Sequence, residues 1–213
     1  MVTLDVTATR SSGGRTRSSF RHQVAVRKSD MEVLGGFVFA GEPLSLLDDG
    51  IFFFTPTELI IPSTFDHAYS FAYMSEAFSI LLDALRALHP AIEDISPIRM
   101  GDDPWTTYVR LSHTALPIMV MGDGFKAGFV ILAYATRGGV LLLDAPDAFQ
   151  HRKGLEVLAR SLVHAAASLG SQVILSTHSL ELLDLLISES VEKRTGLHVY
   201  RFGLMDGQPR VLR

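Results

Sequence analysis

Two short aliphatic runs, each followed by a helical pattern, constrain the fold of this chain most strongly. Residues 140–143 and 173–175 contain no polar side chain, which is typical of strands buried in a parallel sheet. A helical pattern over residues 152–169 separates them and ends at Gly170, and Ser179 is placed to cap a further helix. This alternation of strand and helix predicts an α/β fold with a parallel sheet covered by helices on both faces.

The same alternation begins upstream of these runs. Residues 105–111 alternate like a strand, and we expect a short apolar strand at 118–120. A glycine turn at 122–124 then leads into a helix over 125–134. A hairpin over 200–212, turned at Asp206-Gly207, completes an α/β part that spans residues 105–213.

Residues 1–61 predict an antiparallel β region. Apolar and polar residues alternate over residues 1–30 on both sides of a Ser-Gly-Gly turn at 12–14, which indicates a hairpin. Further strands are expected at residues 37–39, 51–54 and 59–61, the last closed by Pro62.

Residues 62–104 predict a helical insertion. Ser63 is placed to cap a helix whose apolar residues recur at helical spacing up to Leu88. His89-Pro90 ends the pattern, because proline cannot continue a helix. The apolar stripe of this helix indicates a core-facing or partner-facing surface.

Composition excludes several classes of protein. A chain of 213 residues fits one globular domain or one and a half, and 47% hydrophobic with 20% charged residues is too apolar for a disordered chain. No apolar stretch reaches the roughly 18 residues needed to cross a bilayer, and the N-terminus lacks the pattern of a secretory signal. We therefore expect a cytoplasmic protein without membrane insertion. Zero cysteines exclude thiolate metal sites and a cysteine nucleophile.

The charge distribution bears on nucleic-acid binding. A net charge of -4 argues against a surface that binds nucleic acid over its whole extent. Six basic residues nevertheless gather in the first hairpin: Arg10, Arg15, Arg17, Arg21, Arg27 and Lys28. Two interpretations stay open, a solvated hairpin face and a local contact with DNA phosphates.

Chemically useful side chains follow the two aliphatic strands. Asp144 ends the first, and Ser176, Thr177 and His178 end the second, just before a helix N-terminus. The carboxyl ends of parallel strands meet at one sheet edge, where ligands of such sheets bind. A carboxylate there can hold Mg²⁺ through water, and a histidine can donate a hydrogen bond to a phosphate oxygen.

These segments resemble the motifs of ATPases of the ABC, SMC and RecF/OLD type, over roughly residues 115–190. Residues 140–151, VLLLDAPDAFQH, are similar to the Walker B strand and the D-loop that follows it. Residues 172–179, QVILSTHS, resemble the switch-histidine strand, and residues 121–126, MGDGFK, stand in the place of the signature loop. The three motifs also follow one another in the family's order.

The resemblance implies the head of a P-loop NTPase that uses ATP and Mg²⁺. Asp144 would hold magnesium-bound water, and His178 would sense the γ-phosphate. In this family the signature loop meets a nucleotide bound on the partner of a head-to-head dimer. The nucleotide contacts implied here are Gly122, Asp123, Gly124, Lys126, Ser176 and Thr177.

One departure from the family concerns the P-loop. A P-loop requires Gly-x-x-x-x-Gly-Lys-Ser/Thr, yet no Gly-Lys pair occurs anywhere in the sequence. The chain thus resembles a family member without its opening element: a truncated chain, a mis-assigned start or one half of a split enzyme. Its expected partner is a P-loop-bearing subunit or a second copy in a dimer.

A second departure concerns the catalytic carboxylate. Ala145 stands where the family usually carries the residue that activates water, and a methyl group cannot accept a proton. Asp147 could replace it if the loop turned back into the site. Gly122 also replaces the signature serine. The sequence therefore predicts no hydrolysis by this chain alone.

Three other functions remain open. Gly122-x-Gly124-x-x-Ala127, followed by a strand that ends in Asp144, satisfies the fingerprint of NAD(P)-binding Rossmann proteins. A structural or regulatory subunit could keep the ATPase fold without turnover. A hydrolase built on Ser176, His178 and Asp144 lacks the Gly-x-Ser-x-Gly elbow and is the weakest alternative.

Overall fold

The chain divides into two compact units, Met1–Leu46 and Leu47–Arg213. The computed structural model describes residues 2–12, 15–26, 51–75, 78–99, 101, 105–205 and 208–212, with side chains at 51–75, 78–99, 101 and 105–201. In the first unit, β1 (Val2–Ser12) pairs antiparallel with β2 (Arg15–Val26), which confirms the predicted hairpin. The side chains of the basic cluster and the strand predicted at 37–39 lie outside the described residues.

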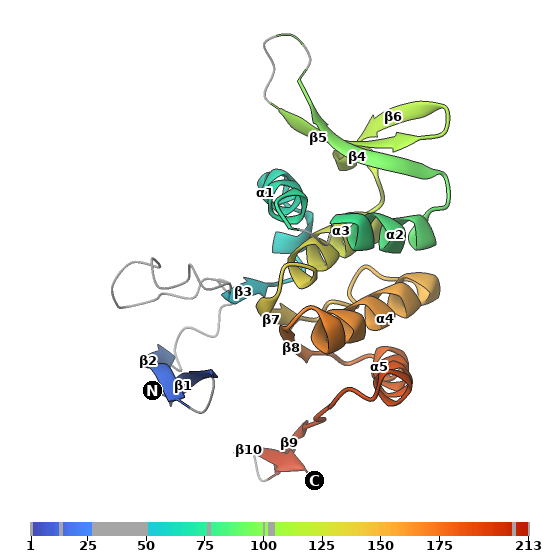
Figure 1. Ribbon diagram of the computed structural model, residues 1–213. Coiled ribbons are helices and arrows are strands. Elements are labelled where there is room, and N and C mark those ends of the chain that lie inside the picture. The colour runs from blue at the N-terminus through green and yellow to red at the C-terminus, as the bar shows by residue number, and fades with distance from the viewer. Residues whose placement is uncertain are drawn as a thin grey trace. The chain divides into compact units, whose positions relative to one another are not determined.

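The second unit contains a three-stranded parallel sheet (Figure 1). Its order is β3 (Ile51–Phe54), β7 (Gly139–Asp144) and β8 (Ser171–Ser176), with β7 in the centre. The strands β7 and β8 confirm the two strands and the parallel pairing predicted from the aliphatic runs. The predicted cover on both faces is wrong, because Ile174 on β8 is 52% exposed. Together with the helices that flank this sheet, the strands give the predicted α/β fold class.

One face of this sheet carries the core. Leu141 and Leu143 are buried on β7, and the rings of Phe52 and Phe54 on β3 lie 4.7 and 4.8 Å from the ring of Tyr134. On the opposite face, Ile174 remains 52% exposed. The helices therefore cover one face more completely than the other among the described residues.

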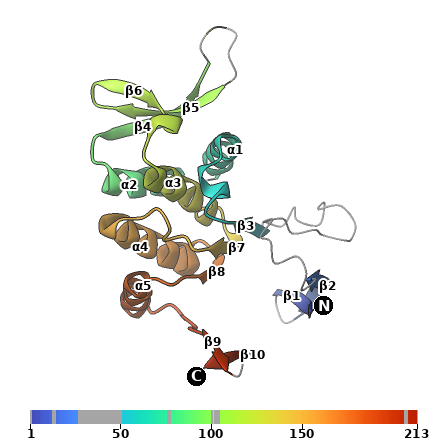
Figure 2. The ribbon, with the colours of Figure 1, turned by 180° about the vertical axis from the view of Figure 1, so that it is seen from behind.

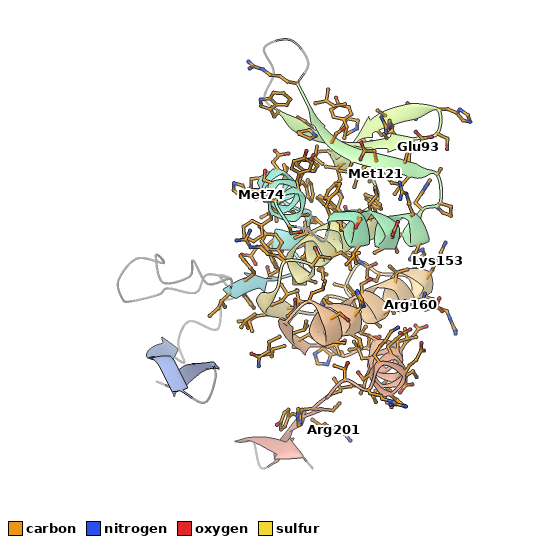
Figure 3. The ribbon with its side chains drawn as sticks, viewed as in Figure 1. Met74, Glu93, Met121, Lys153, Arg160 and Arg201 are labelled. Atoms are coloured by element: carbon orange, nitrogen blue, oxygen red, sulfur yellow. The ribbon has the colours of Figure 1, made fainter. Side chains whose placement is uncertain are left out.

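Helix α3 (Asp123–Ala135) is the centre of the second unit. All nine residues from 127 to 135 are buried and none is charged, as expected of a helix that is apolar on every side. Helices α1 (Pro62–Tyr73), α2 (Phe78–Leu88) and α4 (Arg152–Ser168) pack around it. Helix α5 (Leu180–Lys193) packs against α4, where Arg160 and Glu189 form an ion pair at 3.4 Å (Figures 1 and 3). No helix in the described part of the chain is long and apolar enough to cross a membrane.

A separate antiparallel sheet lies beyond these helices (Figures 1 and 2). It consists of β4 (Ile92–Ile98), β5 (Thr106–Leu111) and β6 (Thr114–Pro117), in that order. Near the end of the chain, β9 (Arg201–Met205) pairs with β10 (Gln208–Leu212), which confirms the predicted hairpin.

The structure corrects the antiparallel region predicted at residues 1–61. Strand β3 runs parallel to β7, with Ile51 opposite Val140 and Phe54 opposite Leu143. An apolar run predicts a strand but not the strand with which it pairs. Here the segment between β3 and β7 is long enough for the crossover that a parallel pair needs. The strand predicted at 59–61 is instead the 3₁₀ helix η2 (Glu58–Ile60). Pro62 is the first residue of α1, a position that proline favours.

The structure also corrects the helical insertion at 62–104. Its single predicted helix is two helices, and Ser63 lies inside α1 instead of capping it. Residues 92–98 form β4, which the sequence analysis missed because Pro97 interrupts its pattern; proline is tolerated there because β4 is an edge strand.

The segments at 105–111 and 118–120, predicted to open the parallel sheet, do not belong to it. Strands β5 and β6 are antiparallel neighbours. The strand predicted at 118–120 is the 3₁₀ helix η3 (Ile118–Val120). An apolar run of three residues fits a strand and a helical turn equally well, so sequence periodicity did not distinguish them.

Candidate functional site

Asp144 and Ser176 meet at the carboxyl edge of the parallel sheet. They are the last residues of β7 and β8 and lie opposite each other in the strand register. The Ser176 hydroxyl donates a hydrogen bond of 2.5 Å to Oδ1 of Asp144. His178 follows two residues after the end of β8 and is exposed. The structure thus brings the ends of the two aliphatic strands to one edge, as their sequence pattern predicted.

A second hydrogen bond joins the two loops beyond this edge. Thr177 donates through Oγ1 to Oδ1 of Asp147 at 2.5 Å and accepts a bond from the Ser179 N–H at 2.9 Å. Ser179 in turn caps α5 by accepting a bond from the Leu182 N–H at 3.1 Å, as predicted. The side chain of Asp147 is therefore anchored to the loop that follows β8.

Ala145 has an unusual backbone conformation between these two bonds. Its φ angle is 43°, in the left-handed region that costs an L-residue roughly 1 kcal/mol or more. Its N–H donates to the carbonyl of Ser176 at 3.1 Å, which holds the turn against β8. Strained residues of this kind gather at functional sites. No local sequence pattern predicts a left-handed backbone conformation at an alanine.

The start of α3 forms the third part of the site. Gly122 is the N-cap and supplies no side-chain cap, so the first N–H groups of the helix lack a side-chain acceptor from that residue. Asp123 and Lys126 form an ion pair at 2.5 Å, and the Lys126 side chain is only 11% exposed. Uncapped N–H groups at a helix N-terminus attract anions.

Gln150 connects this helix start to the loop after Asp144. Its Nε2 donates to the carbonyl of Gly124 at 2.9 Å. A Cβ on Gly124 would lie 2.6 Å from the carbonyl oxygen of Phe149, and a Cβ on Gly154 would collide with Oε1 of Gln150. Two glycines thus make room for this contact. The sequence analysis missed Gln150, because its acceptor on Gly124 lies 26 positions away in the sequence.

His151 also has a structural role in this region. It is the N-cap of α4, and its Nδ1 accepts a hydrogen bond of 3.3 Å from the Gly154 N–H. Because a nitrogen acceptor of this kind carries no proton, the bond assigns the proton of a neutral ring to Nε2. This side chain therefore orients the helix that follows the loop.

The carboxylate of Asp144 fits part of a magnesium site. Mg²⁺ in nucleotide sites is usually held by one or two carboxylates together with phosphate oxygens and water. Asp144 is exposed and supplies one carboxylate. No group of three or more acidic or histidine side chains suited to a metal occurs in the described ranges. The remaining ligands would therefore have to come with a nucleotide.

Comparison with known proteins identifies the family. Residues 63–184, more than half of the chain, match the family model "AAA domain, putative AbiEii toxin, Type IV TA system". The chain belongs to this family. The matched range contains the glycine loop, Asp144 and His178, and the membership confirms the resemblance to P-loop ATPase heads. Residues 63–184 are thus an ATPase-type nucleotide-binding domain.

Two similar proteins extend this comparison. The uncharacterized protein MJECL11 of Methanocaldococcus jannaschii is 39% identical over 72 residues, which is 33% of this chain and 63% of that protein. The match therefore spans less than two thirds of the length of that relative. A solved structure described as "Structural biochemistry of ATP-driven dimerization and DNA stimulated activation of SMC ATPases" has a TM-score of 0.47 at 17% identity, covering 68% of this chain and 88% of that chain. Likeness of this degree does not transfer a function.

The geometry weighs against both alternative enzymes. A Rossmann fingerprint needs a parallel strand directly before the glycine turn, but β6 belongs to the antiparallel sheet and η3 lies between β6 and α3. The prediction of an NAD(P) site is therefore wrong for this fold. In a Ser-His-Asp hydrolase the serine bonds to the histidine, whereas Ser176 donates directly to Asp144.

Proposed function

We propose that this AAA-family domain supplies half of a composite ATP site. In this proposal Asp144 holds magnesium-bound water and His178 contacts the γ-phosphate. A segment outside these 213 residues contributes the P-loop lysine that they lack. The start of α3, at Gly122, Asp123 and Gly124, offers its N–H groups to a nucleotide bound on a partner in a dimer.

The observation that carries the proposal is the linkage of three distant motifs. The Ser176–Asp144 and Thr177–Asp147 hydrogen bonds join the loops after β7 and β8, and the Gln150–Gly124 bond joins the first of these loops to α3. Three hydrogen bonds therefore tie together segments from three parts of the chain. In the proposal, these contacts couple nucleotide binding to dimer closure.

The free side of β8 supports a partner that contributes a strand. β8 pairs with β7, and no strand in the described part of the chain pairs with its other side. The N–H and C=O groups on such an edge accept a further strand. Because a P-loop follows directly after a strand, a parallel strand added here would bring its P-loop to the edge that holds Ser176 and Asp144.

Ala145 favours a regulatory subunit as the second candidate function. It has no group that accepts a proton, and the carboxylate of Asp147 is already bound by Thr177. The domain would then bind nucleotide within a complex and change its association without hydrolysis. Substitution of Ala145 by glutamate separates the two functions, because a gain of hydrolysis in the complex would assign the missing base to this position.

The experiment compares the chain alone with a reconstituted complex. The chain is co-expressed with the polypeptide encoded immediately upstream, provided that this carries Gly-Lys-Ser/Thr. Calorimetry with ATP and Mg²⁺ is expected to show binding to the complex and none to the chain alone. Equally tight binding to the chain alone would contradict the composite site.

A matched pair of variants tests the residue assignment. Asp144→Asn keeps an oxygen acceptor for Ser176 but removes the charge, and it is expected to abolish the magnesium-dependent part of ATP binding. Asp184→Asn removes one charge from the exposed surface of α5 and is expected to leave binding unchanged. Equal binding by the Asp144→Asn and wild-type complexes would refute the role of Asp144.

The expected cytoplasmic location and the contact of the N-terminal arginines with DNA stay predictions.

A further inference from the structure

A cleft of about 350 Å³ lies between α1 and the antiparallel sheet. It is lined by Asp66, Tyr69, Ser70, Pro97, Trp105 and Thr107. Figure 3 labels Met74, directly after α1, and Glu93 on β4, which locate two of the elements that line the cleft. Its residues come from α1, β4, β5 and Trp105 just before β5, and not from the strands that carry Asp144 and Ser176. Its volume lies near the lower end of the roughly 300 to 1,000 Å³ typical of ligand pockets, which fits a single side chain.

The cleft carries the negative charge of Asp66, which forms no ion pair with the residues that the structure describes. Oδ1 of Asp66 accepts a hydrogen bond of 2.8 Å from the hydroxyl of Thr107, whose side chain is fully buried. The ion pairs found in the described part of the chain do not include Asp66. Because Thr107 holds one carboxylate oxygen, the position of the charge is set before any ligand arrives. An anionic ligand would be repelled here, and a cation would be attracted.

Aromatic side chains form the rest of the recognition surface. Trp105 is 59% exposed, and Tyr69 stacks on Tyr73 with 5.6 Å between ring centroids. Burial, followed by Tyr73 and Asp94, raises the pKa of Tyr69, so that its ring stays neutral at physiological pH. Aromatic faces beside a carboxylate favour a flat, weakly hydrated cation, and a guanidinium has both properties.

The surroundings of the cleft favour a polypeptide over a free small molecule. Tyr73, the last residue of α1, and Met74 directly after it are 64% and 70% exposed. Exposed apolar side chains next to a concave site are typical of protein-binding surfaces. Free arginine would leave them in water, whereas a peptide would cover them.

We propose that this cleft binds an arginine side chain of a partner polypeptide. The guanidinium group pairs with the carboxylate of Asp66, and its flat face lies against Trp105. Residues next to the arginine cover Tyr73 and Met74. This site is independent of the proposed nucleotide function, and it stands even if the ATP-binding proposal fails.

The single tryptophan of the chain makes the test direct, because Trp105 lines the cleft. The probes are acetyl-Leu-Arg-Leu-amide and the same peptide with citrulline, which is nearly isosteric with arginine but uncharged. Tryptophan fluorescence and calorimetry give both dissociation constants at fixed ionic strength. The arginine peptide is expected to bind about fivefold more tightly, the ratio expected of one partly exposed ion pair with a cation–π contact. Absence of binding at millimolar arginine peptide would overturn the proposal, as would equal binding of the two peptides.

Two variants locate the effect. Asp66→Asn keeps the acceptor for Thr107, so the fold is expected to persist, and the arginine-to-citrulline ratio is expected to fall close to one. Asp83→Asn removes a charge from the neighbouring helix α2, outside the cleft, and is expected to keep the fivefold ratio. An unchanged ratio in Asp66→Asn would overturn the assignment of the carboxylate.

A third variant distinguishes recognition of the whole peptide from recognition of its arginine alone. Tyr73→Ser is expected to weaken the binding of the tripeptide but not the binding of N-acetyl-arginine amide, since only the tripeptide covers Tyr73 and Met74. Equal effects on both probes would show that the site recognises the amino acid alone and would overturn the polypeptide partner. Should Asp66→Asn fail to fold, the citrulline comparison in the native chain still decides the matter.

Discussion

Gly124 is the position at which the smallest substitution has the clearest structural consequence. A Cβ added there would lie 2.6 Å from the carbonyl oxygen of Phe149, whereas ordinary contacts begin at 3.4 Å. The obstructing atom belongs to the main chain of the loop after Asp144. It cannot rotate away as a flexible side chain would, and Gln150 ties the same loop to the Gly124 carbonyl. We therefore predict that Gly124→Ala separates α3 from this loop or strains both.

The expected destabilisation follows from two opposing effects. Overpacking a well-packed site costs about 1–3 kcal/mol. Alanine in a helix is favoured over glycine by up to about 1 kcal/mol, which offsets part of the clash because Gly124 lies in the first turn of α3. The free energy of unfolding should fall by a net 1–2 kcal/mol or so, a shift of about 0.5–1 M in the urea midpoint.

Gly122→Ala is the matched control for this prediction. It makes the same chemical change two residues earlier, where nothing lies within 4 Å of the added Cβ and φ is an ordinary -61°. Because alanine is a poorer N-cap than glycine, this substitution should cost up to about 1 kcal/mol, less than Gly124→Ala. Urea unfolding of both variants, followed by the fluorescence of Trp105 and by circular dichroism, makes the comparison. Equal stability of the two variants would refute the reasoning from the close approach.

Three further predictions concern stability. Ser179→Ala removes the cap of α5 and should lower the free energy of unfolding by about 1 kcal/mol. Ser179→Asp should retain most of the wild-type stability in urea unfolding. Equal losses in the two variants would show that the cap contributes nothing. Leu158→Ala leaves a cavity in the core between α3 and α4 and should cost about 2–5 kcal/mol in the same assay, so a loss below 1 kcal/mol or so would contradict that packing. Burial raises the pKa of Tyr134 above its ordinary 10.0, so the unfolded state ionises first: stability should be intact below pH 10 and fall as the pH rises further. Tyr134→Phe should remove part of that alkaline loss, and an unchanged dependence on pH would show that this tyrosine is not its source.

The arrangement of the site was partly predictable from local patterns. The aliphatic runs that end in Asp144 and Ser176 identified two strands, and parallel strands place their carboxyl ends at one edge. The cap of α5 was predictable from Ser179, because a capping hydroxyl bonds to an N–H only three residues along the chain. Gln150 was not predictable, since its acceptor on Gly124 lies 26 positions away in the sequence.

The sequence by itself determined where most helices and strands begin and end in residues 122–193, because apolar periodicity, glycines and caps act over a few residues. Only the tertiary structure decided that β3 pairs parallel with β7, that β4 and β5 form a separate sheet, and that Ala145 takes a left-handed conformation. Strand pairing depends on which distant segments bury each other's apolar faces. That choice belongs to the whole fold, and no short segment of the chain encodes it.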